Sequence, residues 1–464
     1  MYWKSGITGG CVTKHICFQW LFFLLTLLIL DNGCRKKTDS SGETTDKIGE
    51  AKDLLWLTPE YQPGTYRNID KIFITRTIRR GTDVYPLPYS LIPLTSVKYS
   101  PDGVNTYDID DFITRNQVAG LLIIKNGEIV LERYAEGNTA QSKWVGFSTG
   151  KSVVSTLVGI AVQDGKINSI YDQVTDYLPG LRSTAYDGVT IRQLLQMSSG
   201  VQWNEDYRDT TSDICAIFQC ILSGNAGCIF DHMAGLPRVA EPGTQFLYKS
   251  GETHLEAEVL KAALGSESIS DYLSRKIWAN MGMEADGYWV LESENGTEFG
   301  GGCLSMTLRD YGRFGIFILN NGIVNGKAIL PPGWVAEAST PAPDSPQCGY
   351  GKLYSELNPC PDPYAYPLGY GYNWWSMPAP SWGRWERLND PLWWGSDAIN
   401  APPPDFTGLI GTFTAQGIFG QFIHVNQKEN MVSIIWSTWK DPWIDPKEYE
   451  TYSFLNAATA LLKR

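Results

Sequence analysis

A serine and a lysine, Ser148 and Lys151, stand three residues apart at the start of an apolar segment. Apolar residues then recur at helical spacing until Asp164-Gly165 supplies a stop signal, so the sequence predicts a buried helix within residues 147–165. Because residues three apart lie on one helix face, the lysine ammonium can reach the serine hydroxyl. Such a pair can make a serine nucleophilic without a histidine. The alternative is that Ser148 only caps the helix.

Two later segments carry groups that such a serine would use. Tyr248, two residues before Ser250, bears a phenol with an ordinary pKa of about 10, so it can move protons only beside a cation such as Lys151. The alternative is a buried tyrosine that only packs its ring. In the second segment, glycines flank Ile418 at the start of an apolar strand and could direct its N–H into a site, as half of an oxyanion hole. Glycines at such places are otherwise ordinary turn residues.

The run 146–150, Gly-Phe-Ser-Thr-Gly, also satisfies the G-x-S-x-G pattern of α/β hydrolases. That fold requires an acid and a histidine later in the chain. The later histidines are His232, His254 and His424, and none has an obvious acid partner in the sequence. Lys151 and the helix after it therefore favour the Ser-x-x-Lys interpretation.

The predicted helices and strands place these groups around one sheet. Two β-rich runs within residues 118–134 flank Asn126-Gly127, a strong hairpin signal. Further strands are expected at 369–375, 420–425 and 431–436, and helices at 190–197, 252–264, 271–281, 304–319 and 449–462. This order implies a sheet built from both ends of the sequence, with a helical insertion between them.

The chain divides into a leader, a tether, an arm and a large domain. Residues 1–34 are predicted to be an export segment, because a basic start precedes an apolar run too short for a comfortable membrane span. Residues 35–53 are polar and aperiodic, as expected for a flexible tether. Residues 54–104 are rich in proline and indicate an irregular N-terminal arm. The main domain is expected at 105–464, with a helical or loop insertion at about 165–300.

The leader ends at Gly33-Cys34, and a cysteine directly after a small residue resembles a bacterial lipoprotein cleavage site. Asp31 and Asn32 stand where that signal prefers an apolar and a small residue. Membrane attachment through a lipid on Cys34 is therefore one hypothesis, beside an ordinary secretory cut and an uncleaved anchor. We expect an exported protein, in the bacterial periplasm or anchored to the envelope.

The composition argues against polyanionic partners and against a metal. The formal net charge is −12 and the pI is about 5.0, and clustered basic residues occur only at 35–37, which disfavours nucleic acid and anionic membrane surfaces. The 4 histidines are scattered singly, and no Cys/His spacing indicates zinc. We therefore expect neither a metal site nor a cofactor.

Six cysteines follow Cys34 and could pair in an exported protein. A Cys348–Cys360 bridge and a bridge within residues 215–228 are the favoured pairings. Cys303, inside an apolar run, can instead be a small buried residue.

Taken together and in this order, three motifs resemble those of the serine β-lactamase and penicillin-binding-protein superfamily. They are Ser148-x-x-Lys151, Tyr248-x-Ser250, and Ala415-Gln416-Gly417 in the place of Lys-Thr-Gly or His-x-Gly. The flanking runs GIAVQDGKI, VTIRQLLQMSSGVQW, EPGTQFLYKSG and GGCLSMTLRDYGRFG are also similar to the family. The resemblance covers roughly residues 105–460 and lies in the class C-like branch of esterases, D-amino-acid peptidases and 6-aminohexanoate-oligomer (nylon oligomer) hydrolases.

The resemblance implies an α/β (α+β) fold of the β-lactamase/transpeptidase type, with an antiparallel sheet flanked by helices and a helical insertion domain. It also implies a serine hydrolase without a cofactor. Ser148 would be the nucleophile, with Lys151 and Tyr248 as the proton-transfer groups, and which of these two is the base stays open. The backbone N–H groups of Ser148 and Ile418 would form the oxyanion hole.

Departures from the family pattern narrow the expected substrate. Ala415 replaces the cation that usually faces the carboxylate of a β-lactam, so efficient β-lactamase activity is not expected. Tyr207 matches the tyrosine that closes over substrate in nylon oligomer hydrolases, but residues 217–219, Ile-Phe-Gln, stand where those enzymes place an amine-binding acid. We therefore expect a small carboxylic ester or amide as substrate, with hydrolysis of amino-capped oligomers less favoured.

The expected substrate-binding residues are Tyr207, Trp203, Ser250, Gln416 and Gly417, and the aromatic residues Trp203, Tyr207, Trp374 and Trp375 could line an apolar acyl pocket. The alternatives are a nylon-oligomer type amidase, a D-amino-acid peptidase, and a non-catalytic binder of cell-wall peptides on the same scaffold. The intact Ser148, Lys151 and Tyr248 argue against a pure binder, which needs no such set.

Overall fold

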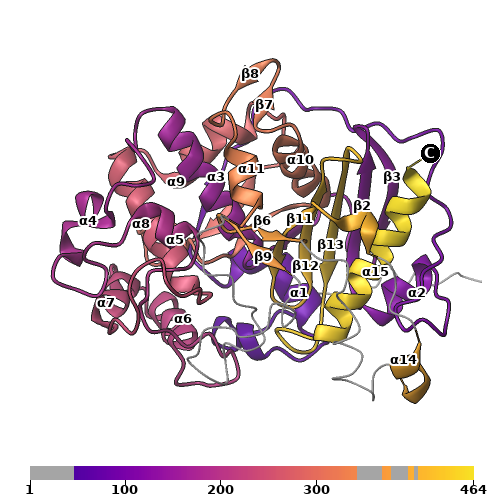
Figure 1. Cartoon of the computed structure of the whole chain (residues 1–464), viewed down its shortest axis with the longest axis horizontal. Helices are drawn as coiled ribbons and strands as arrows, with labels where there is room; N and C mark the ends of the chain where they lie inside the picture. Colours follow the sequence, from indigo (N-terminus) through magenta and orange to yellow (C-terminus); the bar gives the residue numbers. More distant parts are fainter. Residues whose placement is uncertain (1–45, 342–367, 378–394, 402–405, 464) are drawn as a thin grey trace, which may run out of the picture. The chain divides into compact units, whose positions relative to one another are not determined.

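A seven-stranded antiparallel sheet joins segments from both ends of the chain in the computed structural model, which describes residues 46–341, 368–377, 395–401 and 406–463 (Figure 1). The strand order is β3-β2-β13-β12-β11-β10-β9. The strands are β2 (Val118–Lys125), β3 (Glu128–Tyr134), β9 (Gly369–Tyr370), β10 (Trp375–Ser376), β11 (Phe413–Gly417), β12 (Gln421–Asn426) and β13 (Met431–Ser437). Since β2 pairs with β13, the predicted sheet from both chain ends is confirmed.

The hairpin between β2 and β3 turns where the sequence predicts it. Asn126 and Gly127 both adopt positive φ, 53° and 81°, as the tight turn between two strands requires. Side chains of β2 then alternate between two cores: Leu122 faces one and Leu121 the other. Both faces of the sheet are covered, which explains why its central strands are buried along their whole length.

Two helical layers cover the sheet. One contains α3 (Thr149–Gln163) and α10 (Leu308–Leu319), and the other contains α2 (Ile109–Arg115) and α15 (Asp445–Leu462). The other α-helices of the described residues are α1 (Gln62–Arg67), α4 (Val174–Tyr177), α5 (Ile191–Leu195), α6 (Asp213–Ser223), α7 (Cys228–Gly235), α8 (Ser250–Leu264), α9 (Ile269–Leu273), α11 (Trp334–Ser339) and α14 (Ser396–Asn400). Figure 1 shows α4 to α9 grouped beside the sheet, around α3. The helices predicted at 190–197, 252–264 and 449–462 are confirmed as α5, α8 and α15.

A second sheet, which the sequence did not predict, has the strand order β1-β5-β6-β4. Its strands are β1 (Thr75–Ile78), β4 (Lys143–Val145), β5 (Gly287–Val290) and β6 (Leu304–Thr307). The prediction of a continuous helix over 304–319 was therefore wrong: Thr307 ends β6 and caps α10 by accepting a hydrogen bond from the Asp310 N–H. This sheet matters for the site, because β4 leads directly into Ser148.

Three further segments differ from the predictions. The arm at 54–104 is not wholly irregular, because it supplies α1 and β1. The end of the predicted tether packs on the domain, where Asp46 pairs with Arg67 and the Gly49 N–H donates to Thr65 Oγ1 at 2.8 Å. The predicted helix at 271–281 is α9 followed by the π-helix η4 (Ser274–Trp278), and the predicted strand at 369–375 is two short strands, β9 and β10.

A disulfide joins Cys220 to Cys228 and ties the end of α6 to the start of α7, which confirms the predicted bridge within 215–228. Cys215 and Cys303 are buried thiols. The proposed Cys348–Cys360 pair lies outside the described residues.

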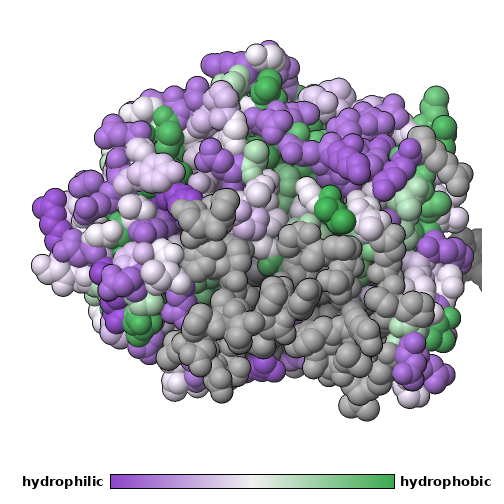
Figure 2. Space-filling view, in the orientation of Figure 1, coloured by the Kyte–Doolittle hydropathy of each residue, from purple (hydrophilic) through white to green (hydrophobic). Residues whose placement is uncertain are grey.

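The predicted export segment and Cys34 also lie outside the described residues. Within the part of the chain that the structure describes, no helix is both long and apolar enough to cross a membrane. On the face shown in Figure 2, hydrophilic residues predominate in the coloured surface, and the hydrophobic ones form small separate groups.

Candidate active site

Ser148 lies at the N-terminus of α3, one residue after a strained turn. Phe147 has φ of 44°, a conformation that is uncommon for a residue with a side chain and clusters at functional sites. The Phe147 ring packs against the rings of Tyr66 and Phe419, which holds this turn in place. The Ser148 side chain makes no capping hydrogen bond and instead accepts one from Lys151 Nζ at 2.7 Å. The hydroxyl is therefore engaged with the lysine and does not cap α3.

Lys151 is buried, with 1% of its surface exposed. Its Nζ also donates to the Gly301 carbonyl oxygen at 2.6 Å, from the loop before β6. Burial lowers the pKa of Lys151 from 10.5 to about 8, although the nearby Glu205 carboxylate opposes this shift. A fraction of Lys151 is therefore neutral at mildly alkaline pH, as a proton acceptor for Ser148 must be.

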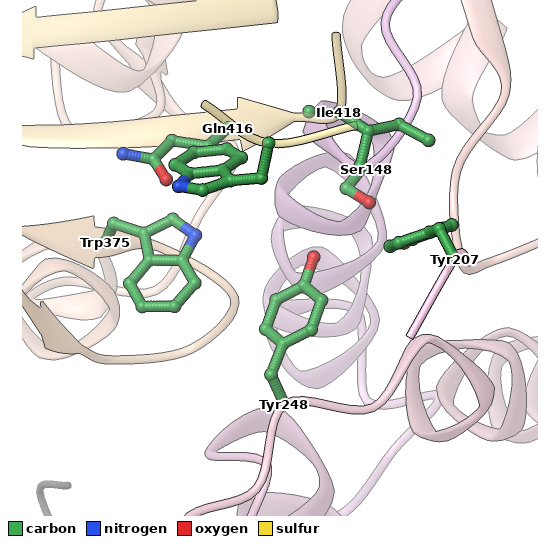
Figure 3. A pocket seen from close by; sticks show the side chains of 8 residues that line it. Ser148, Tyr207, Tyr248, Trp375, Gln416 and Ile418 are labelled. Atoms are coloured by element: carbon green, nitrogen blue, oxygen red, sulfur yellow. The ribbon is translucent and has the colours of Figure 1, made fainter. Parts of the chain in front are cut away.

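Tyr248 lies just before α8 and combines a packed ring with a hydroxyl directed at the site. Its ring stacks on Trp375 at 5.7 Å and meets the edge of Tyr370 at 5.9 Å. Lys151 Nζ lies 5.0 Å from the centroid of the same ring. Figure 3 shows the phenol oxygen pointing toward Ser148. The structure thus brings Ser148, Lys151 and Tyr248 together.

The end of β11 passes over the N-terminus of α3. A Cβ added to Gly417 would lie 2.3 Å from the Gly146 carbonyl oxygen and 3.2 Å from the Ser148 nitrogen, so only glycine allows this approach. Ile418 follows and lies beside Ser148 (Figure 3). The backbone of Ile418 thus lies close to that of Ser148, and these are the two residues whose N–H groups were predicted to form an oxyanion hole.

The sequence predicts that the run 415–417 brings no cation to the site. Gln416 is uncharged, and its side chain amide bonds to residues of α15. Its Nε2 donates to Glu448 Oε1 and to the Tyr452 hydroxyl, both at 2.8 Å and both from α15. Ala415, on the same strand, has no charge to offer. Among the described residues that line the pocket at this strand, none is a lysine or an arginine.

Two pockets open at Ser148. The larger has a volume of about 370 Å³ and is lined by Ser148, Tyr207, Tyr248, Trp375, Gln416, Gly417, Ile418 and Trp443. The smaller, about 220 Å³ with its opening to solvent included, shares Ser148, Tyr207 and Ile418 with it and adds Ser250. Of the predicted substrate-binding residues, four therefore line a pocket at the serine, and Trp203 lines neither. Trp374 is also absent from both walls, because it packs between Phe314 and Phe413.

The sequence did not predict a role for Glu205. Its carboxylate is 2% exposed and holds residues beside Ser148 through hydrogen bonds. It accepts hydrogen bonds from the Tyr207 hydroxyl at 2.7 Å, from the Ser250 N–H at 2.9 Å, from the Ser250 hydroxyl and from Trp203 Nε1. Trp203 thus supports the site through Glu205. The alternating positions 203, 205 and 207 are the one signal in the sequence that could have indicated this acid.

One group of described residues has the composition of a metal site. His254, Glu258 and Glu292 bring possible ligand atoms within 4.8 Å of one another. However, His254 Nδ1 accepts a hydrogen bond from the Gly300 N–H, which places the proton of a neutral ring on Nε2, 3.7 Å from Glu258. Glu292 also accepts from the Ile229 N–H at the start of α7. These contacts favour an internal polar cluster over a metal centre.

The family model described as Beta-lactamase matches residues 109–453, most of the chain. The chain belongs to the beta-lactamase family. This agrees with the resemblance of the three motifs, and the predicted fold of the β-lactamase/transpeptidase type is confirmed.

Three known proteins are similar to this chain in sequence or in fold. A 6-aminohexanoate-dimer hydrolase of Paenarthrobacter ureafaciens is 26% identical over 233 residues, which are 49% of this chain and 58% of that protein. The solved structure of a suggested 6-aminohexanoate-dimer hydrolase from Bacillus anthracis has a TM-score of 0.70 and 20% identity, and covers 91% of this chain and 98% of that one. A family VIII carboxylesterase has a TM-score of 0.51 and 17% identity, and covers 75% and 95%. These two structures share the fold of this beta-lactamase family member.

Proposed function

We propose that this protein is a serine hydrolase that cleaves small carboxylic esters or amides through an acyl-enzyme on Ser148. The single observation that carries the proposal is the 2.7 Å hydrogen bond between the Ser148 hydroxyl and a buried lysine, Lys151, whose pKa is lowered to about 8. A buried lysine with a lowered pKa can accept the proton of a neighbouring serine hydroxyl and so make the serine nucleophilic. Membership in the beta-lactamase family supports the same chemistry.

The reaction would proceed in two steps. Ser148 Oγ attacks the substrate carbonyl carbon, and its proton passes to the Lys151–Tyr248 pair, which then protonates the leaving group. The N–H groups of Ser148 and Ile418 hold the negative oxygen. A water molecule, activated by the same pair, then releases the acid and restores Ser148.

A fluorophosphonate probe tests the nucleophile directly. We expect a covalent adduct on Ser148 by mass spectrometry, and hydrolysis of short-chain nitrophenyl esters that Ser148→Ala reduces by at least about 1,000-fold. Ser155→Ala, another buried serine of α3 and outside both pockets, is the matched control and should retain activity. Absence of the adduct, together with unchanged ester turnover in Ser148→Ala, would refute the proposal.

The same screen separates the alternatives. The 6-aminohexanoate dimer tests the amidase alternative, which Tyr207 and the relative from Paenarthrobacter ureafaciens favour. Nitrocefin tests β-lactam hydrolysis, which should be slow because Gln416 and Ala415 provide no cation. A cell-wall peptide that binds without turnover, in a protein that the probe does not label, would support the non-catalytic binder.

Export and lipid attachment at Cys34 remain our proposals for the location of the enzyme. Palmitate labelling of the wild type and of Cys34→Ala tests the lipid. Equal labelling of the two would contradict attachment at this cysteine.

A further inference from the structure

The smaller pocket at Ser148 gives a substrate a second space to fill. We name it the α6 pocket, because Ile214 and Phe218 of α6 form part of its wall. It shares Ser148, Tyr207 and Ile418 with the larger pocket, so a group bonded to Ser148 has access to both.

Apolar groups form much of the wall of the α6 pocket. Ile214 and Phe218 are only 1% and 7% exposed, so their positions are fixed by packing. The ring of Phe299 meets that of Phe218 edge to face at 5.9 Å. Ile418 closes the side that adjoins the larger pocket. An aliphatic or aromatic chain would bury apolar surface here.

The hydroxyl hydrogens of the same wall are already engaged as donors. The hydroxyls of Tyr207 and Ser250 both donate to Glu205, which accepts two further hydrogen bonds and does not itself line the pocket. Burial raises the pKa of the Cys303 thiol to about 12, so it stays neutral. No charged side chain lines the α6 pocket among the residues that the structure describes.

The position of Tyr248 indicates which part of the substrate enters the α6 pocket. This step rests on the proposed function, in which Tyr248 and Lys151 protonate the leaving group. Tyr248 lines the larger pocket and is absent from the α6 pocket. Trp375, which stacks on Tyr248, also lines only the larger pocket, and Figure 3 shows it on the opposite side of Ser148 from Tyr207, which lines both. The leaving group therefore departs on the Trp375 side, and the acyl chain occupies the α6 pocket.

We propose that the α6 pocket binds the acyl chain of the substrate and that Ile214 and Phe218 select an uncharged aliphatic or aromatic chain over one that ends in an ammonium. An ammonium placed here would lose part of its hydration without gaining a carboxylate in the pocket wall. The enzyme thus takes neutral acyl esters or amides, and a 6-aminohexanoyl group is a poor fit.

A matched pair of esters tests this selection in the intact wild-type protein. The p-nitrophenyl esters of hexanoate and 6-aminohexanoate share the leaving group and the chain length and differ in the terminal ammonium. We expect kcat/KM at pH 7 to favour hexanoate by about 30-fold, since a buried polar group without a partner is strongly disfavoured. From acetate to butyrate, each methylene should raise kcat/KM by about fourfold. Equal rates for the matched pair would overturn the proposal.

Two variants of Phe218 localise the selection. Phe218→Asp introduces a carboxylate and should reduce the preference for hexanoate by at least about tenfold, whereas the neutral variant Phe218→Asn should reduce it less. Phe218→Leu keeps the wall apolar and should retain the preference, and it protects the test against misfolding of the polar variants. Identical preferences in all three variants would contradict the assignment of Phe218.

Labelling of Ser148 distinguishes this proposal from the proposed function. If the probe labels Ser148 and both esters react equally, the hydrolase stands and the selection by the α6 pocket fails. If the probe does not label Ser148 and neither ester reacts, both proposals fail.

Discussion

The hydroxyl of Tyr207 donates a 2.7 Å hydrogen bond to the buried carboxylate of Glu205, at the wall shared by both pockets. Glu205→Gln replaces one acceptor oxygen with an NH2 group, so groups that now donate to that oxygen lose their acceptor, and the Tyr207 and Ser250 hydroxyls would have to accept instead. We expect KM for nitrophenyl butyrate to rise about fivefold with a smaller change in kcat, and the free energy of unfolding to fall by about 1–3 kcal/mol. Steady-state kinetics and urea unfolding measure the two effects. Tyr207→Phe, which removes one donor only, should raise KM without the same loss of stability.

The pH profile should report the buried lysine. Burial lowers the pKa of Lys151 to about 8, so Lys151 is charged and unable to accept a proton below that pH. We expect kcat/KM to rise about tenfold per pH unit below about pH 8 and to level off above it. Lys151→Arg keeps the charge at every working pH and should lose nearly all activity. A wild-type profile that is flat from about pH 6 to pH 9 would contradict the role of Lys151 as the base.

Gly417→Ala should disable the site through the backbone. The added Cβ would meet the Gly146 carbonyl oxygen at 2.3 Å and displace β11 from the Ser148 amide. We expect ester hydrolysis to fall by about 100-fold or more, the size of effect seen when one oxyanion-hole donor is lost. A Cβ added to Gly235 meets no atom within 4 Å, so Gly235→Ala is the control and should leave activity unchanged.

A buried ion pair next to Tyr248 should matter for stability. Lys249 and Glu252 are fully buried, 3.0 Å apart, and Lys249 Nζ also donates to the Ser199 hydroxyl. Lys249→Met leaves the Glu252 carboxylate without its cation and should lower the free energy of unfolding by about 3–5 kcal/mol. The double variant Lys249→Met, Glu252→Leu should recover part of that loss. Guanidinium unfolding curves of the two variants check this, and equal stabilities would argue against the pair.

Loss of the disulfide should loosen the α6 pocket. The Cys220–Cys228 bond closes a short loop between α6 and α7, so removing it should cost about 2–3 kcal/mol and lower Tm by a few degrees. Calorimetry of Cys220→Ser, Cys228→Ser against the wild type measures the change. Because α6 carries Phe218, the preference for hexanoate over 6-aminohexanoate should also weaken in this variant, whereas turnover of the acetate ester should hardly change.

The sequence predicted the elements that depend on residues close together in the chain. The turn at Asn126-Gly127 and the spacing of apolar residues in α3 depend on nearby residues alone, and both are found as expected. The sheet of β1, β4, β5 and β6 was missed because each strand has at most four residues, and because β1 and β4 pair with segments far away in sequence. The start of β6 was mistaken for helix, since the apolar pattern continues through Thr307 without a break.

The motif residues of the site could be predicted from the sequence, but the residues that hold them in place could not. Ser148, Lys151 and Tyr248 carry a recognisable spacing, whereas Glu205 acts through contacts that only the folded chain creates. The sequence alone could not show which of Trp374 and Trp375 lines the pocket, because both are tryptophans. Adjacent residues of an extended segment point to opposite sides, so Trp375 reaches the pocket and Trp374 packs in the core.

The pairing of β2 with β13 also determines when activity can arise during synthesis. A nascent chain that has not yet reached β11 already contains Ser148, Lys151 and Tyr248, yet it lacks β11 to β13 and the Ile418 that lies beside the serine. Such a chain lacks the Ile418 N–H group that would hold the negative oxygen. Products that end before these strands should therefore be inert toward esters.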